Sequence, residues 1–155
     1  RFLDAVDVIR FFWWSSLASG ATPSVADMGT AAGALMDSQL FPVQQQFKKP
    51  VEIVAAYYSA DGAATQCLKR ADGQCFLFED FNPGAPDVAQ YSLDLQEQAD
   101  IYNGLLNAVN GRTWISGFYA YGYNPVVTLR DKSISVRGKP AEAVLAAWYP
   151  KLQGR

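Results

Sequence analysis

Histidine is absent from the 155-residue sequence, and this absence excludes more kinds of chemistry than any other feature of the composition. Nucleophile systems that depend on histidine, such as Ser-His-Asp, and all metal sites built on imidazole are ruled out. Acid–base chemistry would have to use carboxylates, Tyr, Lys or Cys side chains. With 2 cysteines and no imidazole, we expect neither a metal site nor a cofactor.

Long apolar runs and runs of like charge are also missing. No apolar stretch reaches the roughly 18 residues that a membrane-spanning helix needs. Thirteen basic residues stand against 15 acidic ones, so the net charge is −2, and no charged run interrupts the sequence. We therefore expect no membrane-spanning segment and no nucleic-acid partner. Half of the residues are apolar, which is typical of one folded domain over residues 1–155.

Two cysteines, Cys67 and Cys75, bracket a short polar segment with a turn at residues 71–73. Their spacing allows a disulfide that closes a small loop, which would stabilise the fold by roughly 2 to 3 kcal/mol. Because disulfides are typical of exported proteins, we expect an extracellular or cell-surface location, with any export signal outside these residues. Two free thiols in an intracellular loop are the alternative.

Three strand-then-helix units follow one another along the chain. The strands are expected at residues 6–14, 51–58 and 114–123, where β-branched and aromatic residues gather. Helices are expected after Ser24, a good N-cap, after Asp94, which forms a capping-box pattern with Glu97, and from Pro140. This order predicts an α/β fold in which parallel strands are covered by helices.

The first of these helices is expected to present one apolar face to the core. Its members at helical spacing are Met28, Ala32, Leu35 and Gln39. Proline lacks the backbone N–H that a helix interior needs, so Pro42 is expected to kink or restart the helix. The Lys-Lys-Pro run at residues 48–50 is expected to end it.

Three parallel strands make a poor free-standing sheet, because both faces and both edges need cover and only three helices are predicted. We therefore expect a partial α/β barrel whose amino-terminal part is missing here. The opening segment at residues 1–3 fits the end of a preceding helix. A small open α/β domain is the alternative.

Several segments line up in order with one family of enzymes. KPVEIVAAYYSADGAA resembles the seventh strand and following loop of TIM-barrel glycoside hydrolases, above all the family 113 β-mannanase-like group, and VDVIRFFWW is similar to their sixth strand. DLQEQADIYNGLLNAV and WISGFYAYGY resemble the seventh helix and eighth strand, and SISVRGKPAEAVLAAWY resembles the closing helix. The resemblance implies the last three strand–helix units of a (β/α)8 TIM barrel that acts on or binds a polysaccharide or oligosaccharide.

The resembling enzymes use two carboxylates, an acid/base on the fourth strand and a nucleophile near the end of the seventh. The fourth strand would precede Arg1. In the family pattern a Glu follows Lys-Pro after four residues, which places the nucleophile position on Ala55. Counted back from the loop that follows, the position falls on Val54. Neither residue is a carboxylate, so the resemblance implies a glycoside-hydrolase-like protein that is catalytically incomplete.

Glu52 is the carboxylate inside the second predicted strand and the candidate there for a catalytic group. It precedes the implied nucleophile position by a distance of roughly 7 to 10 Å along a strand. Arg10 lies inside the first predicted strand, and a buried ion pair would satisfy both charges. The sequence leaves both roles of Glu52 open.

Aromatic side chains gather where the predicted strands end. Barrel enzymes build their sites at the carboxyl ends of the strands. The rings expected to stack on a carbohydrate there are Trp14, Tyr57, Tyr58, Tyr119 and Tyr121, and simple packing is the alternative for about half of them. Glu79 and Asp80 lie in the loop after the second strand and are expected to be solvated.

The function that these features favour is that of a carbohydrate-active barrel part from an exported protein. A non-catalytic glycan-binding or surface module would keep the aromatic rings without the carboxylates. A small α/β scaffold unrelated to sugars is the third interpretation.

Overall fold

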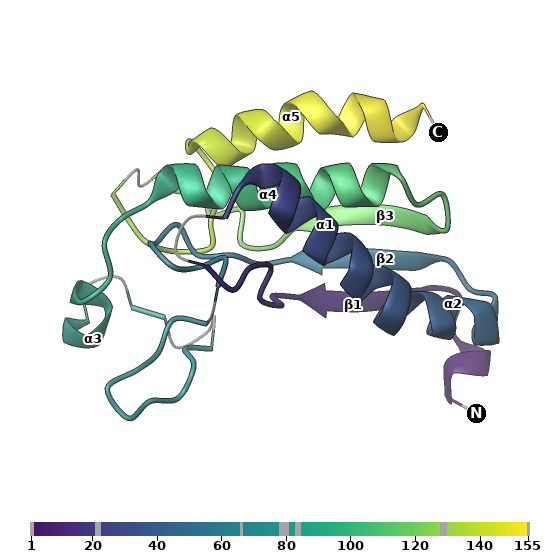
Figure 1. The fold of residues 1–155 in the computed structure, drawn as a ribbon, viewed down its shortest axis with the longest axis horizontal. Coiled ribbons are helices and arrows are strands. Elements are labelled where there is room, and N and C mark those ends of the chain that lie inside the picture. Colours follow the sequence, from purple (N-terminus) through teal and green to yellow (C-terminus); the bar gives the residue numbers. More distant parts are fainter. Residues whose placement is uncertain are drawn as a thin grey trace.

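A computed structural model describes residues 2–20, 23–65, 67–77, 81–82, 85–127 and 130–154. Within these residues, one parallel sheet has the strand order β1 (Ile9–Trp13), β2 (Val51–Ala55) and β3 (Ile115–Ala120), as Figure 1 shows. The longer helices are α1 (Val25–Leu35), α2 (Phe41–Phe47), α4 (Leu95–Asn110) and α5 (Pro140–Gln153); shorter turns are η1 (Phe2–Ala5), η2 (Met36–Leu40) and α3 (Pro86–Ala89). The predicted α/β fold with parallel strands is confirmed, although each strand is shorter than predicted.

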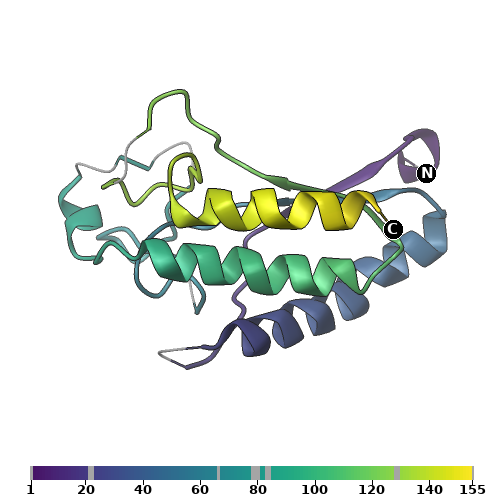
Figure 2. The same cartoon turned by 90° about the horizontal axis from the view of Figure 1, so that it is seen from above.

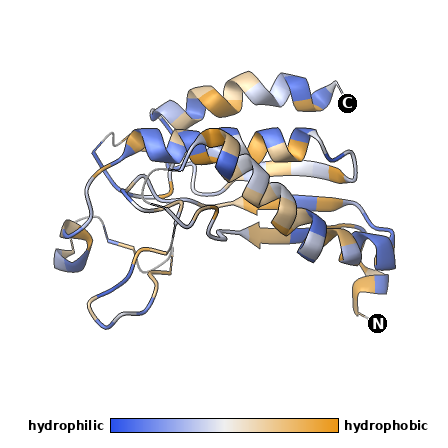
Figure 3. Cartoon of the chain, viewed as in Figure 1, coloured by the Kyte–Doolittle hydropathy of each residue, from blue (hydrophilic) through white to orange (hydrophobic). Residues whose placement is uncertain are grey.

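The long helices lie on one side of the sheet. Figure 2 shows α1, α4 and α5 side by side, with the strands on one side of this helical layer. Side chains of Trp13, Ile53 and Phe118 point into the core between the two layers, where the Tyr102 ring of α4 packs against Phe118 with centroids 6.3 Å apart. Because strand side chains alternate, their neighbours in sequence lie on the opposite face, which no described helix covers. Hydrophobic and hydrophilic segments accordingly both occur along β1 and β2 (Figure 3).

The first helix begins as predicted and then changes its pitch. The Ser24 hydroxyl accepts a hydrogen bond from the Asp27 N–H, and the Asp27 carboxylate accepts one from the Ser24 N–H. The prediction that Gln39 faces the core is wrong, because η2 is a π-helical turn whose extra residue rotates the following side chains. Leu40 is therefore buried and Gln39 is exposed. A proline in the first turn of α2 and a left-handed Lys48, with φ of 52°, confirm the predicted restart and end.

Helices α1 and α4 cross at two glycines. A Cβ atom at Gly104 would lie 3.0 Å from both the Gly29 nitrogen and the Val25 carbonyl oxygen, and a Cβ atom at Gly29 would lie 3.1 Å from the Gly104 oxygen. Backbone atoms cannot move away as a flexible side chain can. The close approach of the two helices therefore requires both glycines.

A Gly104→Ala substitution is expected to destabilise the fold by about 1 to 3 kcal/mol, the usual cost of overpacking a close contact. Urea denaturation followed by circular dichroism measures this change. Gly111→Ala is the matched control, because a Cβ atom there would lie 3.7 Å from the nearest atom and φ is −76°. Equal stability of the two variants would contradict the close crossing.

Candidate functional site

A cavity of about 330 Å³ opens where the carboxyl ends of the strands meet. Its lining comes from β1, from the segments after β2 and β3, and from the loop that carries the two cysteines. The lining residues are Phe12, Trp14, Ala56, Tyr57, Tyr58, Ala63, Cys67, Cys75, Phe76, Leu77 and Tyr121. Four of the five rings predicted to bind carbohydrate thus lie around one cavity, and the fifth, Tyr119, lies on the uncovered face of the sheet.

Three rings form an edge-to-face cluster at the mouth of this cavity. The Phe12 ring lies 5.5 Å from the Trp14 ring and 4.8 Å from the Tyr121 ring, centroid to centroid, in T-shaped contacts. Trp14 is nevertheless 56% exposed, and Tyr121 is exposed as well. Sequence reasoning did not single out Phe12, although its spacing of two residues from Trp14 places both on one face of the chain. The rings of the cluster thus contact one another and keep part of their surface exposed.

Tyr57 and Tyr58 are buried, unlike the rings of the cluster. The Tyr57 hydroxyl donates a 2.6 Å hydrogen bond to the Ser15 carbonyl, and burial raises the pKa of this phenol well above its usual value. The Tyr58 hydroxyl lies 3.5 Å from the Phe76 carbonyl, to which it donates. The two rings border the cavity while their hydroxyls are engaged with the protein.

The predicted ion pair between Arg10 and Glu52 is confirmed. Arg10 Nε and Nη2 donate to Glu52 Oε2 over 2.8 and 2.6 Å, and the Tyr119 hydroxyl donates to Oε1 over 3.3 Å. The hydrogen bond that Arg10 donates to Glu52 raises the pKa of Arg10. A Cβ atom at Gly117 would lie 3.0 Å from Glu52 Cγ, so glycine leaves room for this side chain.

The prediction that this pair is buried is wrong for its arginine. The Arg10 side chain is 59% exposed and the Glu52 side chain 15%, because both lie on the face of the sheet that the helices leave open. The Arg10 guanidinium also lies 5.2 Å above the centre of the Tyr119 ring. One carboxylate, one guanidinium and one phenol thus form a polar group beside the aromatic cavity.

The two implied nucleophile positions point in opposite directions. Val54 pairs in register with Phe12 and Tyr119, whose side chains are exposed on the open face. Ala55 is fully buried in the core beneath the helices. Val54 therefore shares its face with Glu52, which lies two residues deeper along β2.

Lys139 joins the segments that follow β2 and β3, and sequence reasoning missed it. Its ammonium donates to Asp131 Oδ1 over 2.6 Å, to the Ser59 hydroxyl over 2.9 Å and to the Ser133 carbonyl over 3.1 Å. Only 1% of its side chain is exposed. Burial lowers the pKa of Lys139, while the hydrogen bond and charge of Asp131 oppose this shift. The sequence feature that could have drawn attention to Lys139 is its position directly before Pro140, the first residue of α5.

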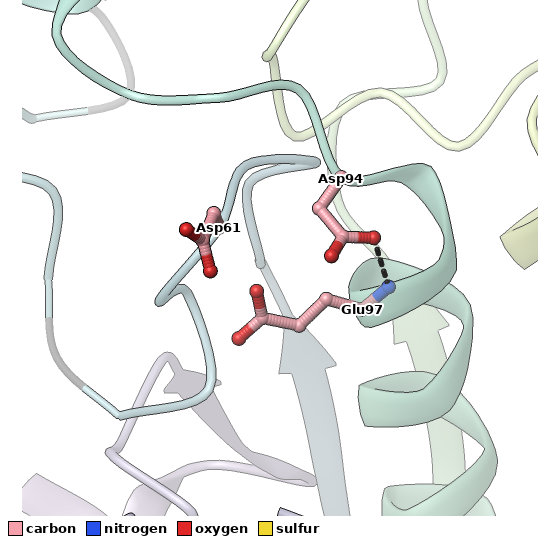
Figure 4. Close-up of side chains that lie close together, drawn as sticks. All are labelled: Asp61, Asp94 and Glu97. Carbon is pink, nitrogen blue, oxygen red and sulfur yellow. Dashed lines mark hydrogen bonds between the residues drawn. The ribbon is translucent and has the colours of Figure 1, made fainter. Parts of the chain in front are cut away.

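A second, partly buried contact holds the loop at residues 61–65. Glu97 Oε2 and Oε1 accept hydrogen bonds from the backbone N–H groups of Gly62 and Ala64, over 2.8 and 2.9 Å. Asp94 accepts the Glu97 N–H over 2.8 Å (Figure 4), which confirms its part of the predicted capping box. The Glu97 carboxylate takes its hydrogen bonds from this loop, and burial raises its pKa. Asp61, Asp94 and Glu97 each place one carboxylate oxygen within 4.8 Å of the others (Figure 4).

The disulfide predicted between Cys67 and Cys75 is confirmed, with Cα atoms 5.6 Å apart. It closes a small hairpin in which Phe76 N–H donates to the Leu68 carbonyl and Arg70 N–H to the Gln74 carbonyl. This hairpin forms one wall of the cavity. Glu79 and Asp80 lie outside the described residues, so their predicted solvation stays a prediction.

Parallel strands with helices on one face and a cavity at their carboxyl ends are the architecture of part of a barrel-type α/β protein. Over its whole length the chain is similar to two solved structures of GH113 beta-1,4-mannanase, each with a TM-score of 0.59 and 26% identity. It spans 41% of those chains. No protein-family model and no curated protein matches the sequence. The predicted resemblance to part of a GH113 enzyme is confirmed.

None of the helices within the described residues is long and apolar enough to cross a bilayer. The longest, α4, has 16 residues, and it packs against α1 and α5.

A Lys139→Met substitution is expected to destabilise the fold by about 3 kcal/mol, because it leaves the carboxylate of Asp131 without its cation in a partly buried site. Thermal and urea unfolding measure the loss. Lys151→Met, on the exposed last turn of α5, is the control and is expected to change stability little. If the Lys139→Met protein is as stable as this control, the hydrogen bonds of the Lys139 ammonium do not stabilise the fold.

A Glu52→Gln substitution is expected to lower stability slightly, because Arg10 is half exposed and water replaces part of the lost interaction. A double-mutant cycle with Arg10→Gln isolates the coupling between the two side chains. We expect a small favourable coupling that weakens as the salt concentration rises. A cycle with zero coupling at low salt would mean that the contact contributes nothing to the fold.

Proposed function

We propose that the chain is the carboxyl-terminal part of a glycoside-hydrolase-like barrel and that it binds a polysaccharide or oligosaccharide at the carboxyl ends of its strands. The observation that carries this proposal is the cluster of exposed rings at that edge, with Trp14 and Tyr121 beside the cavity. The similar solved structures bear the name beta-1,4-mannanase, so β-1,4-linked mannan is the first ligand to test.

The geometry suits a sugar because it offers apolar faces and polar groups side by side. One face of a pyranose presents C–H groups, which pack against aromatic rings such as Trp14. Arg10, Glu52 and the Tyr119 hydroxyl lie on the same open face and can exchange hydrogen bonds with sugar hydroxyls. Tyr57 and Tyr58 support this surface from below, with their hydroxyls engaged by the backbone.

The proposed activity is binding with incomplete catalysis. A retaining glycosidase needs two carboxyl groups about 5 to 5.5 Å apart at the scissile bond. At the implied nucleophile position the open face carries Val54, whose side chain can neither attack a sugar nor transfer a proton. Glu52 is the carboxylate nearest to this position along β2, and it is the residue to test for any direct catalytic role.

The rest of the barrel is the proposed partner of this chain. Among the described residues, β1 and β3 are each paired on one side, and the face with Arg10 and Tyr119 carries no covering helix. Further strands of an amino-terminal barrel part would pair with these edges and enclose that face. The disulfide supports an extracellular or cell-surface location, because such bonds persist in oxidising compartments.

A non-catalytic glycan-binding module is the second candidate, and Val54 is the observation that favours it. In such a module the aromatic surface would serve attachment to a glycan. The two candidates differ in turnover, since a module of this kind releases no reducing ends from mannan. An α/β scaffold unrelated to sugars would show neither binding nor turnover.

Trp14→Ala is expected to weaken binding of mannohexaose about tenfold, because one stacking surface is lost. Isothermal titration calorimetry measures the affinity, and Phe2→Ala, which removes an exposed ring from η1, is the matched control. We expect no release of reducing sugar from mannan. Turnover that Glu52→Gln abolishes would contradict incomplete catalysis, and absence of binding by the unaltered protein would contradict the sugar-binding proposal.

A further inference from the structure

The cavity beside the ring cluster has an unusual lining for a sugar site. None of its described lining residues carries a formal charge. The lining consists of aromatic rings, small aliphatic side chains, Leu77 and the disulfide between Cys67 and Cys75. The ion pair of Arg10 and Glu52 lies on the open face of the sheet and is not part of this lining. The cavity therefore presents mainly apolar surface.

The phenol groups at the base of the cavity are already engaged. The Tyr57 hydroxyl donates its hydrogen to the Ser15 carbonyl, and the Tyr58 hydroxyl donates to the Phe76 carbonyl. A pyranose placed fully inside would bury several hydroxyls next to carbon and sulfur atoms. Each buried hydroxyl without a partner costs free energy, so a whole sugar ring is a poor occupant. An apolar group has no such penalty.

The hairpin that carries the two cysteines forms one wall of the cavity, and a disulfide and backbone hydrogen bonds stabilise it. The disulfide ties the two arms of the hairpin, and the Phe76 N–H donates to the Leu68 carbonyl over 2.9 Å. Phe76 is buried, whereas Leu77, the next residue, is 62% exposed. A volume of about 330 Å³ lies in the usual range for small-ligand pockets. The hairpin therefore gives the cavity a fixed apolar wall.

We propose that this cavity binds the aryl or alkyl group of a substituted glycoside, while the sugar ring itself stacks at the rim on Trp14 and Tyr121. The inference rests on the proposed carbohydrate binding and adds the class of ligand that the site prefers. The rim supplies exposed rings next to polar groups, and the described residues that line the interior supply apolar surface without a charged side chain. A glycoside with an apolar aglycone matches both environments.

The test compares two ligands that differ in the aglycone alone, namely 4-nitrophenyl β-D-mannopyranoside and methyl β-D-mannopyranoside, with mannohexaose as a third. We expect the aryl glycoside to bind about tenfold or more tightly than the methyl glycoside, which is the order expected for burial of one aromatic ring. Calorimetry at several temperatures should also give a more negative heat-capacity change for the aryl glycoside.

Two variants test whether the preference for the aryl glycoside arises from this cavity. Leu77→Asp puts a charge in the apolar wall at an exposed position, so the fold is expected to persist, and circular dichroism checks this. It should bring the aryl-to-methyl affinity ratio close to one. Val126→Asp makes the same change at an exposed apolar residue outside the lining and should keep the ratio. An unchanged ratio in Leu77→Asp overturns the inference.

The outcomes separate this inference from the proposed function. A protein that binds mannohexaose but has equal affinity for the two monosaccharide glycosides overturns the apolar-aglycone inference and leaves sugar binding standing. A protein that binds none of the three ligands overturns the proposed function and this inference with it. A strong aryl preference that Leu77→Asp removes supports both.

Discussion

The constraint on which the rest of the structure depends is that helices cover one face of the parallel sheet and leave the other face open. Side chains alternate along each strand, so neighbouring residues meet opposite environments. Ile53 and Ala55 enter the core under the helices, while Glu52 and Val54 face the open side. A charge at Glu52 is tolerated for this reason, since Arg10 and solvent both reach it.

The edge of the sheet that carries the cavity depends on buried polar contacts as well as on packing. The Lys139 ammonium ties Ser59 after β2 to Asp131 and Ser133 after β3, and Glu97 holds the loop at residues 61–65. Burying these ions costs desolvation energy, and the several hydrogen bonds that each one makes offset part of this cost. The loops at the site are thus fixed by α4 and by the start of α5.

The candidate site shows which features a linear pattern can predict. The ion pair of Arg10 and Glu52, the disulfide and the exposed ring of Trp14 follow from residue type and strand order. The burial of Tyr57 and the role of Lys139 do not, because each depends on a partner far away in the sequence, the Ser15 carbonyl for Tyr57 and the Ser59 hydroxyl for Lys139. Exposure of Arg10 likewise depends on which face the helices cover.

The sequence by itself determined the alternation of strands and helices, the helix caps at Ser24 and Asp94, and the spacing that lets the two cysteines pair, because these depend on local periodicity and short-range geometry. The parallel direction of the strands followed from the helical connections between them. The sequence also determined the apolar residues where the resembling enzymes have a nucleophile. The tertiary structure alone decided that Val54 rather than Ala55 points to the open face, and that the disulfide hairpin encloses an apolar cavity. Both results depend on which distant segments pack together, and the local sequence does not determine that packing.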